Sequence, residues 1–281
     1  MLEPELNPMP FPLPEVLLGD QERHRNDGPS WYLDPLVAEQ KRRIFRTWIR
    51  SLLETRNPGV VLKTDLFEEA YNRDHLLWDL FSKTRLSIGV DLDLRTPALA
   101  AARNSVGGVA YLVADVRSLP LKDGSVDVIV STSTLDHFDD ATDLDASIVE
   151  MARVLRPAGS LFLMLDNPRN PLYPLLRWFS HRGWTPFALG QTLAAPVMVR
   201  KLELAGLRVI QTAGLIHNPR LISTLLFLAL RRVLGRHADR PIRSLLALFA
   251  LLERLPSRQV TACFVAACAT KPVPAGWYPS Q

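Results

Sequence analysis

The chain of 281 residues is long enough for one large α/β domain or two small ones, and its 47% hydrophobic content allows a substantial buried core. Its formal charge of +4 comes from basic residues scattered among acids. Nucleic-acid binding is not expected, because the sequence has no basic stripe with interleaved aromatic residues. The two cysteines lie in one apolar run and fit buried core residues in a reduced compartment better than a disulfide framework.

Residues 1–30 are rich in proline and polar side chains, so we expect a flexible leader followed by a single domain over residues 31–281. The acids and prolines of this start do not match a signal peptide. The longest apolar stretch, at 221–230, is shorter than a membrane span and runs directly into Arg231 and Arg232. These features predict a cytoplasmic protein.

The first half of the chain alternates apolar runs with segments of helical periodicity. A first helix is expected over 31–54, where apolar residues recur at near-helical spacing, and Asn57 to Gly59 should end it. Strands are then predicted at 59–63, 85–91, 109–115, 126–132 and 159–167, with helices at 65–84, 95–104 and 143–156. This alternation predicts a parallel sheet with right-handed crossovers.

The second half is less regular. Residues 167–192 are rich in proline and aromatic side chains and read as an insertion over the strand ends. A helix at 192–206, a strand at 207–217, a second insertion at 218–258, a last strand at 259–271 and a tail at 272–281 should follow. Within the second insertion, 221–235 and 241–255 form two amphipathic helices, which could pack on the sheet or contact a membrane surface or a protein partner.

Acidic residues stand where the strand at 85–91 ends. Asp91 closes the run Gly-Val-Asp, and Asp93 follows two residues later. A carboxylate at the carboxyl end of a parallel strand can accept both hydroxyl groups of a nucleoside ribose, as in dinucleotide-binding sheets. The alternative is a helix cap or an ordinary surface acid. Asp91 is thus the first candidate for a nucleoside contact and Asp93 the second.

A run of ordered motifs extends this pattern. The strand at 109–115 ends in Val-Ala-Asp-Val-Arg-Ser-Leu-Pro, and the strand at 126–132 leads into Ser-Thr-Leu-Asp-His. With seven strands placed, the chain resembles the class I S-adenosylmethionine-dependent methyltransferases, and within them the methyltransferase type 11 group. The resemblance covers 59–165 well, and 194–216 with the last strand more loosely. It implies a doubly wound Rossmann-like sheet of seven strands, mostly parallel with the last antiparallel, and S-adenosylmethionine as cofactor.

The resemblance also assigns roles at the adenine end of such a cofactor. Asp115 would accept a hydrogen bond from the adenine amino group, and the backbone N–H of Val116 would meet the ring. Leu119 and Leu121 would flank the adenine. The alternative for Asp115 is an ordinary turn residue.

Further roles follow along the next two strand ends. Ser131 lies in the loop that runs beneath the methionine part of the cofactor in the family. His137 faces the acceptor there and could take a proton from a hydroxyl or phenol group, although it could equally be structural or line the substrate. Asp166 and Asn167 end the fifth strand, at the rim where an acceptor would contact them.

The segment after the first strand departs from the family. Relatives carry a pattern like VLDxGxGxG, whereas this chain reads VLKTDLFEEA, with Lys63 in place of the aspartate and acidic or aromatic residues at the glycine positions. In one interpretation, Asp65 and Glu68 form a capping arrangement that closes the loop over the methionine site. In the other, Thr64, Asp65 and Glu68 face the positively charged end of the cofactor and Lys63 reaches its carboxylate.

Two functions therefore remain open from the sequence. The first is an S-adenosylmethionine-dependent methyltransferase acting on a small or lipophilic molecule. The second is a binding or scaffold protein that keeps the fold and has lost the chemistry, so whether the chain is an enzyme stays undecided. A nicotinamide-dependent oxidoreductase would need GxGxxG after the first strand, and the chain has no such loop. The oligomeric state is not indicated.

Overall fold

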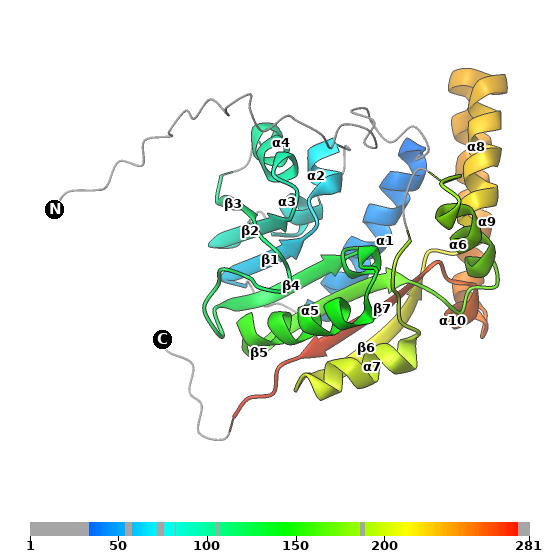
Figure 1. Cartoon of the computed structure of the whole chain (residues 1–281). Coiled ribbons are helices and arrows are strands. Elements are labelled where there is room, and N and C mark those ends of the chain that lie inside the picture. Colours follow the sequence, from blue (N-terminus) through cyan, green and yellow to red (C-terminus); the bar gives the residue numbers. More distant parts are fainter. Residues whose placement is uncertain are drawn as a thin grey trace.

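A computed structural model describes residues 34–53, 58–71, 76–81, 83–104, 107–185 and 189–274. The predicted leader and the end of the predicted tail lie outside these residues. A seven-stranded sheet forms the centre of the molecule (Figure 1). Its strands are β1 (Val60–Thr64), β2 (Leu86–Asp91), β3 (Val109–Val113), β4 (Val126–Thr132), β5 (Leu155–Asp166), β6 (Arg208–Leu215) and β7 (Phe264–Thr270).

The strand order is β3-β2-β1-β4-β5-β7-β6, and β7 runs antiparallel to both of its neighbours. This confirms the predicted doubly wound sheet with an antiparallel last strand. The other strands are parallel, so the carboxyl ends of β1, β2, β4 and β5 meet at one edge. The register places Thr64 of β1 beside Val90 of β2 and Ser131 of β4, which brings the predicted site residues to that edge.

Helices cover both faces of the sheet. They are α1 (Pro35–Leu53), α2 (Phe67–Tyr71), α3 (Leu76–Phe81), α4 (Arg95–Arg103), α5 (Ala141–Val154), α6 (Tyr173–His181), α7 (Ala195–Leu204), α8 (Arg220–Leu234), α9 (Asp239–Ala250) and α10 (Arg258–Thr261). Apolar residues of α5 and α7 pack on one face of the sheet, and those of α1 to α4 pack on the other. Because both faces are covered, β1 and β4 are buried along their whole length, as near-continuous apolar runs predict.

Element boundaries differ from the sequence prediction in three places. The single helix expected over 65–84 is two helices among the described residues, and the Glu69 carboxylate accepts the N–H of Leu77 at the start of α3 (3.2 Å). Strand β5 begins at Leu155 rather than at Gly159, because Leu155 pairs with Val126 across an irregularity in the register. Residues 259–261, expected to open the last strand, belong to α10.

The two amphipathic helices of the second insertion, α8 and α9, lie side by side at one end of the sheet (Figure 1). Their inner face packs on the start of α1 through Phe227, Ile242 and Leu246, which meet Leu36. No helix in the described part of the chain has both the length and the apolar character needed to cross a bilayer.

Candidate functional site

The loop after β1 is built around a buried ion pair. Lys63 is 1% exposed, and its ammonium donates to the Glu69 carboxylate (2.9 Å) and to the backbone carbonyl of Asp65. The second oxygen of Glu69 is held by the Leu77 N–H, so both members of the pair have partners within the protein. Burial lowers the pKa of Lys63, but the neighbouring carboxylates, Glu69 first, outweigh it and hold that pKa above its ordinary value.

Asp65 takes the backbone conformation that a glycine would favour. Its φ of 65° lies in the left-handed region, where aspartate is better tolerated than most residues. Its N–H donates to the carbonyl of Val90 (2.9 Å), and its carboxylate accepts the N–H of Phe67 (2.8 Å). Burial raises the pKa of this half-buried carboxyl group, whereas the positive charge of Lys63 lowers it. The charges of Asp91 and His137 also act on it. Asp65 therefore lies at the carboxyl edge of the sheet.

Glu68 does not complete the capping arrangement with Asp65 that one interpretation of the sequence expected. Its carboxylate forms an ion pair with Lys41 of α1, while the Asp65 N–H is bonded to β2. Lys63 likewise does not point toward a ligand, because Glu69 and a backbone carbonyl hold its ammonium. The loop is thus fixed by partners on α1, α3 and β2.

Asp91 ends β2 and anchors this loop. Its two carboxylate oxygens accept the N–H groups of Leu66 and Asp93, each at 3.0 Å. Leu66 lies against Gly89, where a Cβ atom would come within 2.6 Å of the leucine methyl carbon, so any larger residue would require the Leu66 side chain to shift. Asp91 is half-exposed, and each of its oxygens keeps a second lone pair for a ligand.

Asp93, the second predicted nucleoside contact, supports the next helix. Its carboxylate accepts the Thr96 hydroxyl (2.7 Å) and the Arg95 N–H (3.5 Å) in the first turn of α4. Asp93 thus supports the first turn of α4 from outside the helix, while Leu94 occupies the N-cap position without a side-chain cap bond.

Asp115 lies in the turn after β3 and is covered by Arg117. The guanidinium contacts both carboxylate oxygens (2.5–3.0 Å), reaches Asp143 (2.7 Å) and lies over the Phe138 ring (5.5 Å). Hydrogen bonding from Arg117 holds the pKa of the Asp115 carboxyl below its usual value. Val116, expected beside the adenine, is 7% exposed.

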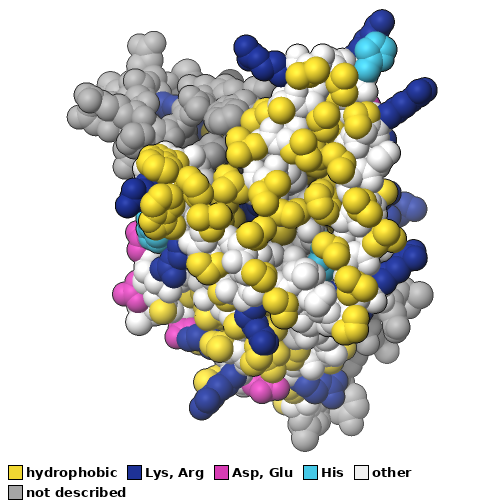
Figure 2. All heavy atoms as spheres, turned by 90° about the vertical axis from the view of Figure 1, so that its right-hand side faces the viewer, with side chains coloured by type: hydrophobic (Ala, Val, Ile, Leu, Met, Phe, Trp, Pro, Cys, Tyr) yellow, Lys and Arg dark blue, Asp and Glu magenta, His cyan; other side chains and the backbone are white. Residues whose placement is uncertain are grey.

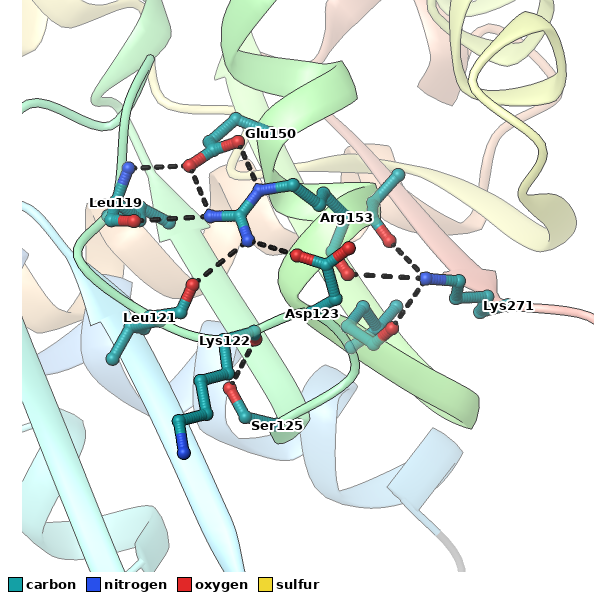
Figure 3. Close-up of polar contacts among 10 residues, drawn as sticks. Leu119, Leu121, Lys122, Asp123, Ser125, Glu150, Arg153 and Lys271 are labelled. Carbon is teal, nitrogen blue, oxygen red and sulfur yellow. Dashed lines mark hydrogen bonds and ion pairs between the residues drawn. The ribbon is translucent and has the colours of Figure 1, made fainter.

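The loop that follows Asp115 is braced from α5 (Figure 3). Arg153 donates to the carbonyls of Leu119 (3.1 Å) and Leu121 (2.9 Å) and to Glu150 (2.7 Å), while Glu150 accepts the Leu119 N–H (2.6 Å). At the end of the same helix, Lys271 donates to the carbonyls of Ala152, Arg153 and Leu155, which caps the helix C-terminus. The brace fixes the position of the predicted adenine loop.

Replacing Arg153 with alanine is expected to release this loop. The carbonyls of Leu119 and Leu121 would lose their donor, and amide hydrogen exchange over 117–124 should speed up by about tenfold or more. Hydrogen exchange with mass spectrometry measures this. Lys122→Ala is the matched control, since Lys122 is exposed and its ammonium points away from the cluster (Figure 3). Equal exchange in the two variants would contradict the brace.

The ends of β1 and β4 are joined by hydroxyl groups. Thr64 is 1% exposed, and its hydroxyl bonds to those of Ser131 (3.0 Å) and Thr134 (2.7 Å). Ser131 is fully buried. Both predicted cofactor residues therefore lie at the expected edge, and their hydroxyls are bonded to each other beneath it.

Two buried carboxylates face one another after β4 and β5. Asp136 is 4% exposed and accepts the Asp166 N–H (3.2 Å), while its Oδ1 is buried without a partner among the described residues. Asp166 is 2% exposed and pairs with Arg220 of α8 (2.5 Å). Burial, and then the charge of Asp166, raises the pKa of Asp136 to about 7. Asp136 was not among the residues predicted for the site, although it lies directly before the candidate His137.

His137 and Asn167 have contrasting environments. His137 is exposed in a short 3-10 helix, Leu135–His137, and its charge acts on both Asp65 and Asp136. Asn167 is 2% exposed, and its amide donates to the carbonyls of Gln259 (3.0 Å) and Ala262 (2.9 Å). His137 is thus available at the rim, whereas Asn167 holds the turn between α10 and β7.

Known proteins share the central part of this architecture. A family model described as a methyltransferase domain matches residues 76–163. A probable S-adenosylmethionine-dependent methyltransferase of Mycobacterium tuberculosis is 34% identical over 139 residues, 49% of this chain and 46% of the relative. The chain thus spans about half the length of the curated relatives it matches.

Solved structures extend the likeness to most of the fold. An S-adenosylmethionine-dependent methyltransferase from Mesorhizobium loti superposes with a TM-score of 0.56 over 83% of this chain and all of its own, at 13% identity. The chain has the class I methyltransferase fold. The [4+2]-cyclase SpnF aligns equally well, with a TM-score of 0.56 over 83% of this chain and 81% of its own at 17% identity, so this fold alone does not fix the reaction.

The methyltransferase-family match begins at Leu76, after the loop that departs from the family pattern. Within that loop, Lys63 replaces the family's aspartate and Glu69 replaces its last glycine. In this chain the Lys63 ammonium and the Glu69 carboxylate form the buried ion pair. A buried ion pair thus stands at two positions where the glycine-rich pattern has an aspartate and a glycine.

Asp136 predicts a pH dependence of folding in this methyltransferase fold. The folded state binds the Asp136 proton more tightly than the unfolded state does, because the pKa is higher when the protein is folded. The protonated carboxyl group therefore contributes to stability at acidic pH, and this contribution to the free energy of unfolding is lost between about pH 4 and pH 7. Asp136→Asn should therefore raise the free energy of unfolding by about 2–4 kcal/mol at pH 8 and by little at pH 4. Urea unfolding at the two pH values measures this, with the exposed Asp139→Asn as control. An equal effect at both pH values would contradict it.

Proposed function

We propose that the chain binds S-adenosylmethionine and transfers its methyl group to a small, lipophilic acceptor. The observation that carries the proposal is the half-exposed carboxylate of Asp91 at the carboxyl end of β2, beside the turn that carries Asp115. In a doubly wound sheet this edge is where nucleotide cofactors bind. The methyltransferase family match and the relatives named as S-adenosylmethionine-dependent support the choice of cofactor.

The adenosine end of this site would be held by Asp91, Asp115 and Val116. Asp91 has lone pairs left for the two ribose hydroxyls after binding the N–H groups of Leu66 and Asp93. Asp115 and the N–H of Val116 would hold the adenine. Arg117 would have to share the Asp115 carboxylate or move from it, since the pair forms on the exposed side of the turn.

The methionine end would be held by acidic groups rather than by a glycine-rich turn. Asp65 would bind the ammonium, in place of the aspartate that the family carries two residues earlier. The hydroxyls of Thr64 and Ser131 would lie beneath it. When bound, the cofactor supplies an electrophilic methyl group on a sulfonium, and the chain's part is to align the acceptor with it. His137, exposed at the same rim, would take the acceptor's proton.

A lipophilic acceptor is supported by the surroundings of Asp166. Arg220, its ion-pair partner, lines an apolar hollow between α6 and the start of α8. The other side chains of the hollow are mostly aliphatic or aromatic, including Leu172, Tyr173, Leu175, Leu176, Leu221 and Ile222. Such a lining favours a small apolar molecule, with the ion pair of Arg220 and Asp166 at its edge.

Calorimetric titration of the purified full chain with S-adenosylhomocysteine and S-adenosylmethionine tests the cofactor. We expect saturable binding of both. The absence of heat at millimolar ligand, with a folded protein, would overturn the proposal. Methyl transfer to candidate lipophilic acceptors is a separate experiment, because a failure there would reject the acceptor class and leave cofactor binding intact.

A second candidate function, a non-catalytic binding protein, is supported by the side chains that occupy the proposed cofactor site. The buried pair of Lys63 and Glu69 occupies the loop at the methionine end of the proposed site, and Arg117 covers Asp115 at its adenine end. A non-catalytic binding protein with the same fold would need neither end open. Failure of the calorimetric titration would favour this function.

Arg117 gives a prediction that concerns the adenine end alone. Arg117→Met keeps an apolar contact with Phe138 and frees the Asp115 carboxylate, so S-adenosylhomocysteine should bind several-fold more tightly. Calorimetry measures the change, with Arg95→Met, on the exposed first turn of α4, as control. Weaker binding in Arg117→Met would mean that the guanidinium itself holds the adenine.

A further inference from the structure

The outer face of the α8–α9 pair is apolar and exposed, although its inner face packs on α1. Val233 is 80% exposed, Leu225 62% and Leu248 59%. Figure 2 shows apolar side chains gathered across this face of the molecule, which extends onto α6. The inner side of these helices packs on the protein, whereas the outer side presents several large apolar side chains to solvent.

The segment that carries α8 and α9 is much more basic than the rest of the chain. Residues 220–258 hold eight arginines and two acidic residues, a net charge of +6, whereas the whole chain has +4. The remainder of the molecule is therefore slightly acidic. Six of these arginines are exposed: Arg232, Arg236, Arg240, Arg243, Arg254 and Arg258. Figure 2 shows basic side chains around the edge of the apolar face, with acidic ones mainly toward its lower left.

Tryptophan completes the pattern at the side of α6. Trp178 is 44% exposed and Trp184 is 61% exposed, and their rings meet edge to face at 5.4 Å. The guanidinium of Arg182 lies 4.2 Å from the centre of the Trp178 ring. Exposed indole rings next to arginine are typical of the boundary between lipid headgroups and acyl chains.

We propose that this face, formed by α6, α8 and α9, docks on the surface of a bilayer that contains anionic phospholipids. The apolar side chains would enter the acyl boundary while the arginines contact lipid phosphates, as in amphipathic helices that lie in the interface. The six exposed arginines favour an anionic bilayer over a second copy of this chain, because two such faces would bring like charges together. The docking does not depend on methyl transfer.

Vesicle flotation of the full chain tests the docking. Vesicles of phosphatidylcholine alone and of equal parts phosphatidylcholine and phosphatidylglycerol serve as probes. We expect the protein to float with the anionic vesicles, and to do so less as salt is raised. Leu225→Glu combined with Val233→Glu should reduce binding by about tenfold or more. Leu204→Glu, at a position 77% exposed on α7, is the matched control and should bind like the original chain.

Several outcomes would overturn the proposal: no flotation with anionic vesicles, equal flotation with both vesicle types, or equal loss in the α7 control. A dimer in light scattering that the double variant dissociates, without vesicle binding, would assign the face to a second copy instead. Should the double variant fail to fold, Arg232→Gln with Arg236→Gln replaces it, with the same expected loss on anionic vesicles. Quenching of tryptophan fluorescence by brominated lipid, reduced in Trp178→Phe/Trp184→Phe, is an independent readout that should agree.

Discussion

Replacing Lys63 with alanine is expected to lower the free energy of unfolding by about 3–5 kcal/mol, because it leaves the Glu69 carboxylate buried without its counter-charge. Glu69 is fully buried, so water cannot replace the lost ammonium. The backbone carbonyl of Asp65 would lose a donor as well. Urea unfolding at neutral pH, followed by circular dichroism, gives the change.

Two further variants distinguish the stabilising effect of the buried Lys63–Glu69 pair from that of an ordinary surface ion pair. Lys201→Ala removes a pair with Asp145 at the surface and should cost no more than about 1 kcal/mol. Lys63→Met combined with Glu69→Leu removes both charges and should recover most of the stability, since apolar residues of similar size often replace a buried ion pair without loss. If Lys63→Ala costs no more than Lys201→Ala, the ion pair does not stabilise the loop.

The same variants bear on function. The buried pair holds the loop between β1 and α2, at the carboxyl edge of the sheet. If the double variant folds and still binds S-adenosylhomocysteine, the pair serves the fold, and Asp65 and Asp91 carry the binding. If it folds and binds no longer, the charged pair itself positions the loop for the ligand.

The fold could be predicted from the sequence because its signals are local. Apolar runs that end in an acidic or small residue indicate buried parallel strands, and these run at nearly the predicted positions in β1, β2 and β4. The prediction of one helix over 65–84 differs from the two helices of the described residues. Apolar spacing does not reveal that the Glu69 carboxylate accepts the Leu77 N–H at the start of the second helix. Such a hydrogen bond depends on a side chain that folds back from the preceding helix.

Site chemistry was less accessible from the sequence, because it depends on partners distant in the chain. Asp166 pairs with Arg220, 54 residues later, and Asn167 bonds to carbonyls more than 90 residues away. No sequence signal marks Asp136, because only the sheet brings it beside Asp166. By contrast, Asp91 could be found directly, since its position at the end of β2 follows from the strand pattern.

Asp91→Ala is expected to weaken S-adenosylhomocysteine binding by about 10- to 100-fold, the range set by losing a charged hydrogen-bond acceptor for the ribose. The change also removes the acceptor of the Leu66 and Asp93 N–H groups, so part of the loss could come from a loosened loop rather than from the ribose. Calorimetry alone does not distinguish these causes, and the variants must therefore divide the two roles of this carboxylate.

Asp91→Asn divides them, because its amide oxygen can still accept the Leu66 N–H while the charge and one acceptor are lost. We expect it to keep the unfolding free energy close to that of the original chain, yet to bind S-adenosylhomocysteine at least several-fold more weakly. Asp93→Ala is the opposite control: it removes the acceptor of the Thr96 hydroxyl in the first turn of α4, with a stability cost of about 1 kcal/mol, and leaves Asp91 in place. If Asp91→Asn binds S-adenosylhomocysteine normally and Asp93→Ala binds it weakly, then Asp93 rather than Asp91 holds the ribose. Loss in Asp91→Asn alone, on a folded protein, would identify Asp91 as the residue that holds the ribose.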